Sequence, residues 1–305
     1  MNLFKTEGLI PATYTPLHPD GSLNTDLIPA YAKHLKAAGV AGVFICGTTG
    51  EGLLLNLEAR KALAEAWAPH GDAGFRVMVH VGAAACKDAC ELAAHAQAVG
   101  ANAIGAMGPN FLPPNRLNEL IAWCREVAAA GGELPFYYYH IPQVSGVQAS
   151  MIGFLQEAQQ QIPTLAGIKY SHHDLMELAQ CVAADAGRWD ILFGRDEILI
   201  SGMALGIRGA VGSTYNYMAP HFLRIIAAYD AGDHALALEL QVKAIAAIDL
   251  LIRYGGGVGG GKPLMKLIGL DCGPVCRPVR PLSDRELLDY ERALRAIGFF
   301  EWGIS

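Results

Sequence analysis

The sequence predicts an α/β fold in which eight parallel strands, each followed by a helix, close into a barrel. Short apolar, β-branched or aromatic runs recur along the chain, and longer stretches with apolar residues at helical three-and-four spacing separate them. The runs are apolar at nearly every position, which is typical of a parallel sheet buried on both faces. Eight such units within about 215 residues fit a closed (β/α)8 barrel, the TIM barrel, better than an open doubly wound sheet.

Each expected strand is followed by a turn signal. The strands span residues 9–15, 40–47, 75–82, 101–108, 134–141, 165–171, 190–196 and 209–214. The second to fourth runs end in glycine, and the fifth, LPFYYYHI, is aromatic and precedes a proline. The clearest helices span residues 25–39, 57–70 and 87–100, and the last of these closes at Gly100, a C-cap signal. No GxGxxG motif opens a helix after the first strand, which weakens a dinucleotide-binding alternative.

After about residue 218 the alternation stops and only helical periods follow. Helices are expected in residues 221–232, 234–255 and 283–298, and a glycine-rich loop, GGGVGGGK, is expected over residues 255–262. We therefore divide the chain into a barrel that carries the active site, residues 1–218, and a helical extension packed on it, residues 219–305.

Composition excludes several classes of protein. The 305 residues are 52% hydrophobic, enough for a large core, and the net charge of −6 without a Lys/Arg run argues against nucleic acid or an anionic membrane as partner. The seven scattered cysteines indicate reduced thiols, and their spacing offers no zinc-binding pattern of the usual kind. No signal pattern or membrane-length apolar run is present, so we expect a cytoplasmic chain.

In this architecture the active site lies at the carboxyl ends of the strands. The segments there carry a possible nucleophile, a proton carrier, a hydroxyl-rich turn and an acidic pair: Gly47–Glu51, Tyr137–His140, Lys169, Gly194–Glu197 and Gly212–Thr214. We expect these groups to share one rim.

Lys169 and one tyrosine are the expected reactive groups. Lys169 lies inside an apolar strand, where a charged ammonium is poorly solvated, and a neutral amine forms a Schiff base with a carbonyl. The alternative is a strand-end lysine that reaches solvent or a carboxylate. Strand alternation places Tyr137 and Tyr139 on one side and Tyr138 on the other. We expect Tyr139 to carry a proton, Tyr138 to pack against the helices and Tyr137 to lie in the core.

The remaining polar residues each have two readings. The Thr48–Thr49 turn between glycines offers N–H groups and hydroxyls to a carboxylate, or is an ordinary strand-to-helix turn. Asp196 and Glu197 bind sugar-like hydroxyls, or are first-turn acids favoured by a helix dipole. His172 and His173 could be metal ligands, but they are more simply explained as exposed loop histidines.

Five motifs together resemble one family. In order and spacing, GTTGEG (47–52), YYYHIP (137–142), GIK (167–169), GRDE (194–197) and GAVGSTYNYM (209–218) resemble the class I aldolase superfamily of N-acetylneuraminate lyase and dihydrodipicolinate synthase. The resemblance covers nearly the whole chain, and within the superfamily the chain is most similar to the N-acetylneuraminate lyases.

The resemblance implies a role for each matched residue. Lys169 would form the Schiff base, Tyr139 would move the proton during carbon–carbon cleavage, and Thr48 and Thr49 would bind the pyruvoyl carboxylate, with Thr48 also in the proton relay. The polyhydroxyl tail would be held by Ser171, Gly194, Asp196, Glu197 and Ser213. The implied reaction is reversible cleavage of N-acetylneuraminate to N-acetylmannosamine and pyruvate by a homotetramer, with no metal or organic cofactor.

Four positions depart from the family pattern. Val144 stands where the synthases place an arginine for a second carboxylate, which argues against that activity. Arg195 stands where lyases often have tyrosine or an apolar residue; it would neutralise Asp196 or bind an acidic group on a different sugar acid. The segment 255–261 lacks the aromatic residue that some lyases have in this loop. Phe111 and Leu112 stand where the synthases have a tyrosine that relays protons. The alternatives are an aldolase or dehydratase for another 2-keto-3-deoxy sugar acid and, in another class, a non-catalytic sugar-acid sensor.

Overall fold

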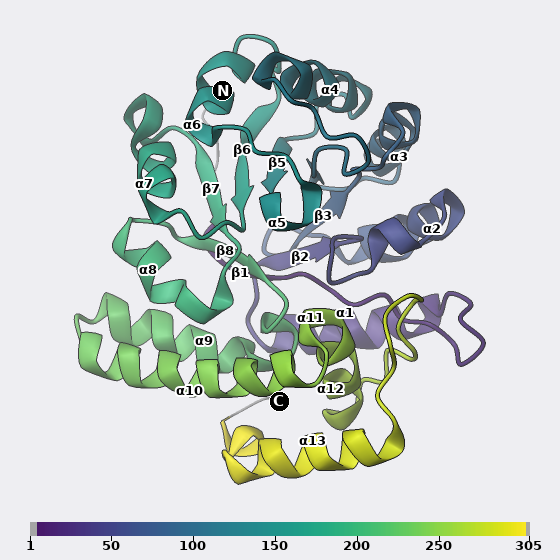
Figure 1. Cartoon of the computed structure of the whole chain (residues 1–305), viewed down its shortest axis with the longest axis vertical. Coiled ribbons are helices and arrows are strands. Elements are labelled where there is room, and N and C mark those ends of the chain that lie inside the picture. The colour runs from purple at the N-terminus through teal and green to yellow at the C-terminus, as the bar shows by residue number, and fades with distance from the viewer. Residues whose placement is uncertain (1–4, 303–305) are drawn as a thin grey trace.

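The computed structural model describes residues 5–302 and has the predicted barrel (Figure 1). Eight parallel strands form one sheet in the order β1-β8-β7-β6-β5-β4-β3-β2. Their bounds are β1 Gly8–Pro11, β2 Gly42–Ile45, β3 Arg76–His80, β4 Ala103–Ala106, β5 Phe136–His140, β6 Leu165–Tyr170, β7 Asp190–Phe193 and β8 Gly209–Gly212. A parallel bridge between Ala12 and Phe44 joins β1 to β2 and closes the ring.

Helices surround the sheet (Figure 1). They are α1 Ile28–Ala37, α2 Leu57–Trp67, α3 Cys86–Ala98, α4 Leu117–Ala130, α5 Pro142–Ser145, α6 Met151–Ala158, α7 Leu175–Ala183, α8 Leu199–Ala204 and α9 Tyr215–Asp230. Side-chain caps fix several starts: Asn56 accepts from the Ala59 N–H, and Asp174 accepts from the N–H groups of Met176 and Glu177. The observed strands are shorter than the predicted runs, because the residues at the ends of those runs form the loops around the barrel mouth.

The core has two parts, one inside the barrel and one between barrel and helices. The inner part contains Phe44, Tyr137 and Tyr139 among other residues. Tyr138 belongs to the outer part, with its ring 4.9 Å from that of Phe154 in α6. The predicted alternation of the three tyrosines is therefore confirmed.

The C-terminal third is helical, as predicted, with α10 His234–Arg253 packed beside α9 and α13 Asp284–Ala296 following (Figure 1). The boundary expected after residue 218 falls within α9. No helix in residues 5–302 combines the length and the apolar character needed to cross a membrane.

The prediction of a loop over residues 255–262 is wrong. This segment forms α11 Gly256–Gly259 and then α12 Gly261–Leu267. Gly255 has φ +112°, which ends α10 and lets the chain turn, and a Cβ at Gly261 would lie 1.8 Å from the Tyr14 hydroxyl oxygen. Close packing against Tyr14 therefore explains the glycine, and tertiary contacts override the poor helix propensity of the sequence.

Candidate active site

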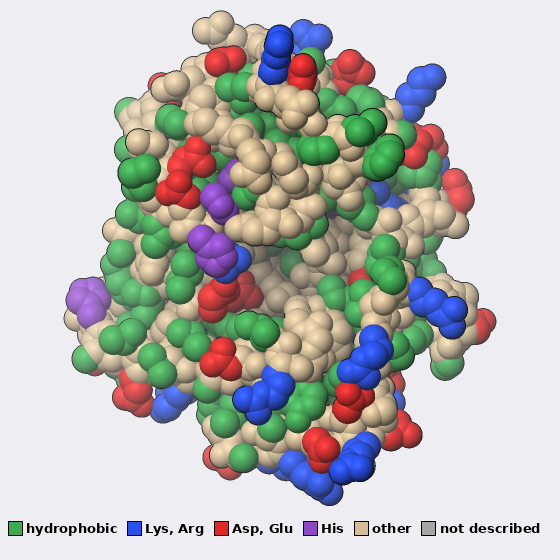
Figure 2. Space-filling model, in the orientation of Figure 1, with side chains coloured by type: hydrophobic (Ala, Val, Ile, Leu, Met, Phe, Trp, Pro, Cys, Tyr) green, Lys and Arg blue, Asp and Glu red, His purple; other side chains and the backbone are tan. Residues whose placement is uncertain are grey.

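A cavity of about 380 Å³ opens at the carboxyl ends of the strands. Figure 2 shows its mouth as a hollow near the centre of the face, with basic, acidic and histidine side chains beside it. All nine site residues predicted from the sequence line this cavity: Thr48, Thr49, Tyr139, Lys169, Ser171, Gly194, Asp196, Glu197 and Ser213. The structure therefore brings together residues that are up to 165 positions apart in the sequence.

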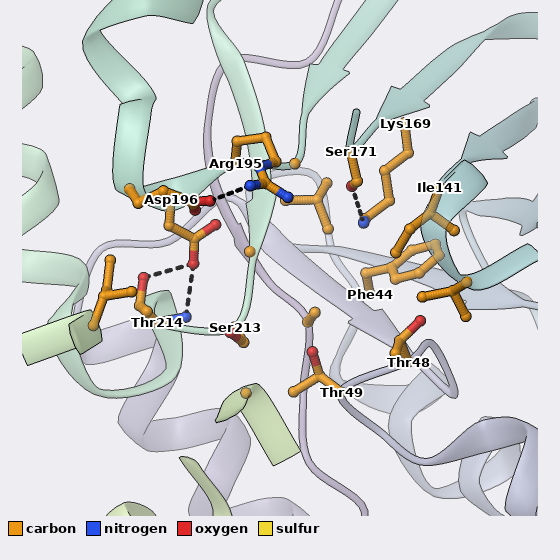
Figure 3. A pocket seen from close by; sticks show the side chains of 18 of the residues that line it. Phe44, Thr48, Thr49, Ile141, Lys169, Ser171, Arg195, Asp196, Ser213 and Thr214 are labelled. Carbon is orange, nitrogen blue, oxygen red and sulfur yellow. Dashed lines mark hydrogen bonds and ion pairs between the residues drawn. The ribbon is translucent and has the colours of Figure 1, made fainter. Parts of the chain in front are cut away.

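Lys169 and Tyr139 face each other inside the barrel because β5 and β6 are neighbours and pair these two residues in register. Lys169 is 4% exposed, and its Nζ lies 3.6 Å from the centre of the Tyr139 ring. The same amine donates a hydrogen bond to Ser171 Oγ at 3.1 Å (Figure 3). Among residues 5–302 no carboxylate pairs with it. The alternative of a strand-end lysine that reaches solvent or an acid is therefore wrong.

Tyr139 places its hydroxyl beside the turn that follows β2. Its oxygen lies 3.4 Å from Thr48 Oγ1, at the outer limit of a hydrogen bond. The ring is fixed edge-on against Phe44 and His80, with ring centres 5.8 Å and 5.9 Å away. Packing rather than polar bonds therefore positions this phenol, and its oxygen stays available to a bound molecule.

The threonine turn is anchored from behind by a buried ion pair. Glu51 adopts φ +57° and is 3% exposed, and its Oε1 lies 2.8 Å from Nζ of Lys262 in α12. Its second oxygen accepts a bond from the Cys276 N–H. Thr15 Oγ1 also donates to the Gly50 carbonyl at 2.5 Å. The sequence does not predict the pairing of Glu51 with Lys262, since the two residues are 211 positions apart and no motif links them.

Asp196 is buried and already bonded on one oxygen. Its Oδ2 accepts from the N–H of Thr214 at 2.9 Å and from its Oγ1 at 2.6 Å (Figure 3). Burial raises the pKa of Asp196, and the two bonds from Thr214 oppose that rise. Gly212 is required here because a Cβ would lie 1.7 Å from Oδ1. Asp196 therefore holds the turn after β8, and among residues 5–302 its Oδ1 has no hydrogen-bond partner.

Arg195 pairs with Glu197 rather than with Asp196. The Arg195 Nη2 to Glu197 Oε1 distance is 2.6 Å, and Nη2 also lies 2.8 Å from a ring nitrogen of His173. The expectation that Arg195 neutralises Asp196 is therefore wrong. The reason is geometric: Asp196 points inward to Thr214, whereas Arg195 and Glu197 lie nearer the solvent, with side chains 22% and 34% exposed.

Other cavity residues were not predicted from the sequence. Ile248, Leu251 and Ile252 of α10 form an apolar wall, and Gly257 of α11 lies beside it. The C-terminal helices thus complete a site whose polar groups come from the barrel. Phe111 and Leu112 are 73% and 80% exposed and do not line the cavity, so the departure from the family at that position changes nothing inside it.

Comparisons with known proteins agree on one family. Residues 5–297 match the Dihydrodipicolinate synthetase family. The chain is similar to the N-acetylneuraminate lyase of Homo sapiens, with 39% identity over 303 residues, 98% of this chain and 94% of the human one. Among solved structures, Proteus mirabilis N-acetylneuraminate lyase superposes with a TM-score of 0.94 at 40% identity over 97% of this chain and all of its own. The native N-acetylneuraminate lyase of Aliivibrio salmonicida gives 0.93 at 40%, over 97% and 98%.

Proposed function

The chain belongs to the dihydrodipicolinate synthetase family, and from this premise we infer that it is a class I aldolase that reversibly cleaves N-acetylneuraminate to N-acetylmannosamine and pyruvate. The observation that carries the inference is the pairing of Lys169 with Tyr139 inside the cavity, with Nζ 3.6 Å from the phenol ring. A binding protein for sugar acids needs neither a buried amine nor a phenol beside it.

Lys169 is the proposed nucleophile. Its amine attacks the C2 keto carbon of the open-chain sugar acid, and loss of water gives the Schiff base. The Tyr139 hydroxyl passes its own proton through Thr48 Oγ1 to the bound carboxylate, and its oxygen takes the proton of the C4 hydroxyl as the C3–C4 bond breaks. The bonding electrons move to C3 and the iminium nitrogen, which gives an enamine and the aldehyde of N-acetylmannosamine. Return of the proton to C3 and hydrolysis release pyruvate and restore Lys169.

Thr48 and Thr49 are the proposed carboxylate site. The turn offers two hydroxyls and backbone N–H groups next to Lys169, and the Glu51–Lys262 pair fixes it from behind. A carboxylate bound there brings the adjoining keto carbon to the lysine. Thr48 also lies 3.4 Å from the Tyr139 hydroxyl, which supports its proposed place in the proton relay.

The proposed site for the polyhydroxyl tail extends from Ser171, which is hydrogen-bonded to Lys169, along the turns that follow β7 and β8. Its members are Ser171, Gly194, Asp196, Glu197 and Ser213. Gly194 allows Ser171 to approach, because a Cβ there would lie 1.9 Å from Ser171 Oγ. The free oxygen of Asp196 and the Glu197 carboxylate are acceptors for sugar hydroxyls, and the aliphatic wall of α10 suits the acetyl methyl and carbon backbone.

The rival substrate is a 2-keto-3-deoxy sugar acid whose terminal carboxylate binds Arg195. Glu197 already pairs with that guanidinium at 2.6 Å, which favours the N-acetylated, polyhydroxyl substrate. Dihydrodipicolinate synthesis is disfavoured because Val144 lines the cavity where that reaction needs an arginine.

Borohydride trapping with pyruvate, followed by peptide mass mapping, tests the proposal. We expect a reduced adduct on Lys169 in the parent and none in Lys169→Met, with Lys243→Met, a surface lysine, as the matched control. Absence of an adduct on Lys169 would refute the Schiff-base role. Pyruvate release from N-acetylneuraminate, compared with release from 2-keto-3-deoxygluconate, then identifies the preferred substrate.

We also propose a cytoplasmic homotetramer built of a barrel, residues 1–218, and a helical extension, residues 219–305. Exposed apolar side chains on α10, Leu238 at 59% and Val242 at 56%, support burial of that helix face between subunits. Light scattering of the purified chain at several concentrations tests the assembly.

A further inference from the structure

The outer faces of β5 and β6 carry an unexplained histidine. These two strands point Tyr139 and Lys169 into the barrel, and the next residues, His140 and Tyr170, therefore point outward. His140 is 2% exposed, yet neither of its ring nitrogens has a hydrogen-bond partner in the described part of the chain. A buried polar group without a partner costs free energy, so this imidazole requires an explanation.

Two further groups converge on His140. Ligand atoms of His140, His172 and Glu177 all lie within 4.8 Å of one another. The centres of the two imidazole rings are 5.3 Å apart, and the rings are nearly perpendicular at 87°. Nδ1 of His172 is also buried, and it has no hydrogen-bond partner within residues 5–302. The three residues come from the end of β5, the loop after β6 and the first turn of α7.

Glu177 is oriented by its own contacts. Its Oε1 accepts from the Met151 N–H at 2.7 Å, and its Oε2 lies 3.4 Å from the Tyr170 hydroxyl. The short bond fixes the carboxylate, and Oε2 keeps a lone pair for another partner. Such outer contacts of a ligating carboxylate are typical of metal sites.

We propose that His140, His172 and Glu177 form a binding site for a divalent transition metal, with Zn²⁺ the best match. Two imidazole nitrogens and one carboxylate oxygen are a known ligand set for zinc, with metal–ligand distances of about 2.0–2.2 Å. Tetrahedral ligands at that distance lie about 3.4 Å apart, so a small rotation of side chains closes the observed cluster. His172 and Glu177 are half-buried, so the cluster is not fully enclosed by the protein.

The local electrostatics agree with this assignment. Asp174 and Glu177 stand at the start of α7, Asp174 as its N-cap and Glu177 in its first turn, and together they supply negative charge on this side of the cluster. A bare packing role for His140 against Tyr170, at 5.0 Å between rings, accounts for the ring faces but not for the unpartnered nitrogens.

A metal there acts as a structural cross-link. None of the three ligands lines the substrate cavity, so the ion does not touch the reacting atoms. It joins the strands that carry Tyr139 and Lys169 to the first turn of α7, on the side away from the cavity. This revises the sequence-based expectation of no metal, in which His172 was treated as an exposed loop residue.

Cobalt is the probe for this site. The purified full-length chain is stripped with a chelator and titrated with Co²⁺, and visible absorption bands of low-symmetry Co²⁺ are recorded along with metal content. We expect one equivalent bound in the parent, displacement by Zn²⁺ and a higher melting temperature with Zn²⁺ present. His172→Asn and Glu177→Gln should weaken binding at least tenfold and remove the melting shift.

The controls separate this site from unspecific binding. Glutamine at 177 keeps an oxygen for the Met151 N–H, so Glu177→Gln should fold as the parent does. His95→Asn removes a surface histidine that also has a carboxylate neighbour, Glu65 at 2.9 Å, and should bind Co²⁺ as the parent does. A parent without the one-equivalent bands, or equal affinity in parent and His172→Asn, would overturn the proposal.

Discussion

The two sides of the cavity use their polar groups differently. On the lysine side (Lys169, Tyr139 and Thr48), the described part of the chain gives the amine one hydrogen bond, to Ser171, and the phenol one long contact, to Thr48. On the arginine side (Arg195, Asp196 and Glu197), two bonds from Thr214 and an ion pair of 2.6 Å already engage the side chains. The groups expected to react are positioned by packing, whereas the groups expected to bind the sugar hydroxyls are positioned by hydrogen bonds and an ion pair. Substitutions on the lysine side should therefore lower kcat, and substitutions on the arginine side should change KM slightly.

Tyr139→Phe gives the largest effect among these predictions. The ring keeps its edge contacts with Phe44 and His80, so the Lys169 adduct with pyruvate should form as in the parent. Loss of the phenol oxygen should lower kcat by roughly 10²–10⁴, as for other lost acid–base groups. Steady-state kinetics with N-acetylneuraminate measure this. Equal kcat in variant and parent would contradict the proton-transfer role.

Lys262→Met tests how much the Glu51–Lys262 ion pair, which supports the Thr48–Thr49 turn on the lysine side, contributes to stability. The change leaves the Glu51 carboxylate buried without its cation, which should lower the free energy of unfolding by about 3–5 kcal/mol. Denaturant unfolding measures it, and Lys243→Met, which breaks a surface pair with Glu239 of 2.8 Å, is the matched control. Adding Glu51→Gln to Lys262→Met should restore part of the loss; no recovery would show that the charge of Glu51 is not the cause.

His80 gives the lysine side a pH dependence. Burial first, then Arg60 and Lys169, hold the pKa of His80 well below 6.5, and its Nε2 accepts from the Met107 N–H at 3.2 Å. Because the unfolded chain binds a proton below pH 6.5 and the folded chain does not, stability falls as pH falls through that value, by up to about 1.4 kcal/mol per pH unit. His80→Gln should flatten the unfolding free energy between pH 6.5 and 5; equal slopes would contradict this.

Arg195→Gln gives the smallest effect. A partly exposed ion pair is worth about 0–1 kcal/mol, so KM for N-acetylneuraminate should change less than tenfold and kcat should stay near that of the parent. The same variant assayed with a keto-deoxy sugar acid that carries a terminal carboxylate sharpens the comparison. A loss of activity confined to that substrate would mean that Arg195 leaves Glu197 to bind the terminal carboxylate of the substrate.

The sequence predicted what depends on local pattern. Strand periodicity gave the barrel and the inward side of the tyrosine run. The strand ends gave eight of the nine predicted cavity residues, because parallel strands end at one face, and the family resemblance gave Ser171. Contacts between distant segments could not be predicted: the pairing of Glu51 with Lys262 and the α10 wall at Leu251. The pairing of Arg195 with Glu197 instead of Asp196 is local, but it depends on the direction in which each side chain points. The helices α11 and α12 were missed because tertiary contacts, such as the packing of Gly261 against Tyr14, rather than propensity, determine them.

The wall built by α10 has a consequence for synthesis of the chain. When β8 has just been synthesised, every side chain proposed to react is already in the chain, whereas Ile248, Leu251 and Lys262 are still to be added. Until then the threonine turn lacks its cation and the mouth of the barrel is open on one side. Binding of a sugar acid therefore awaits the last part of translation, and a nascent chain passes through a stage in which it has the chemistry of an aldolase without an enclosed place to perform it.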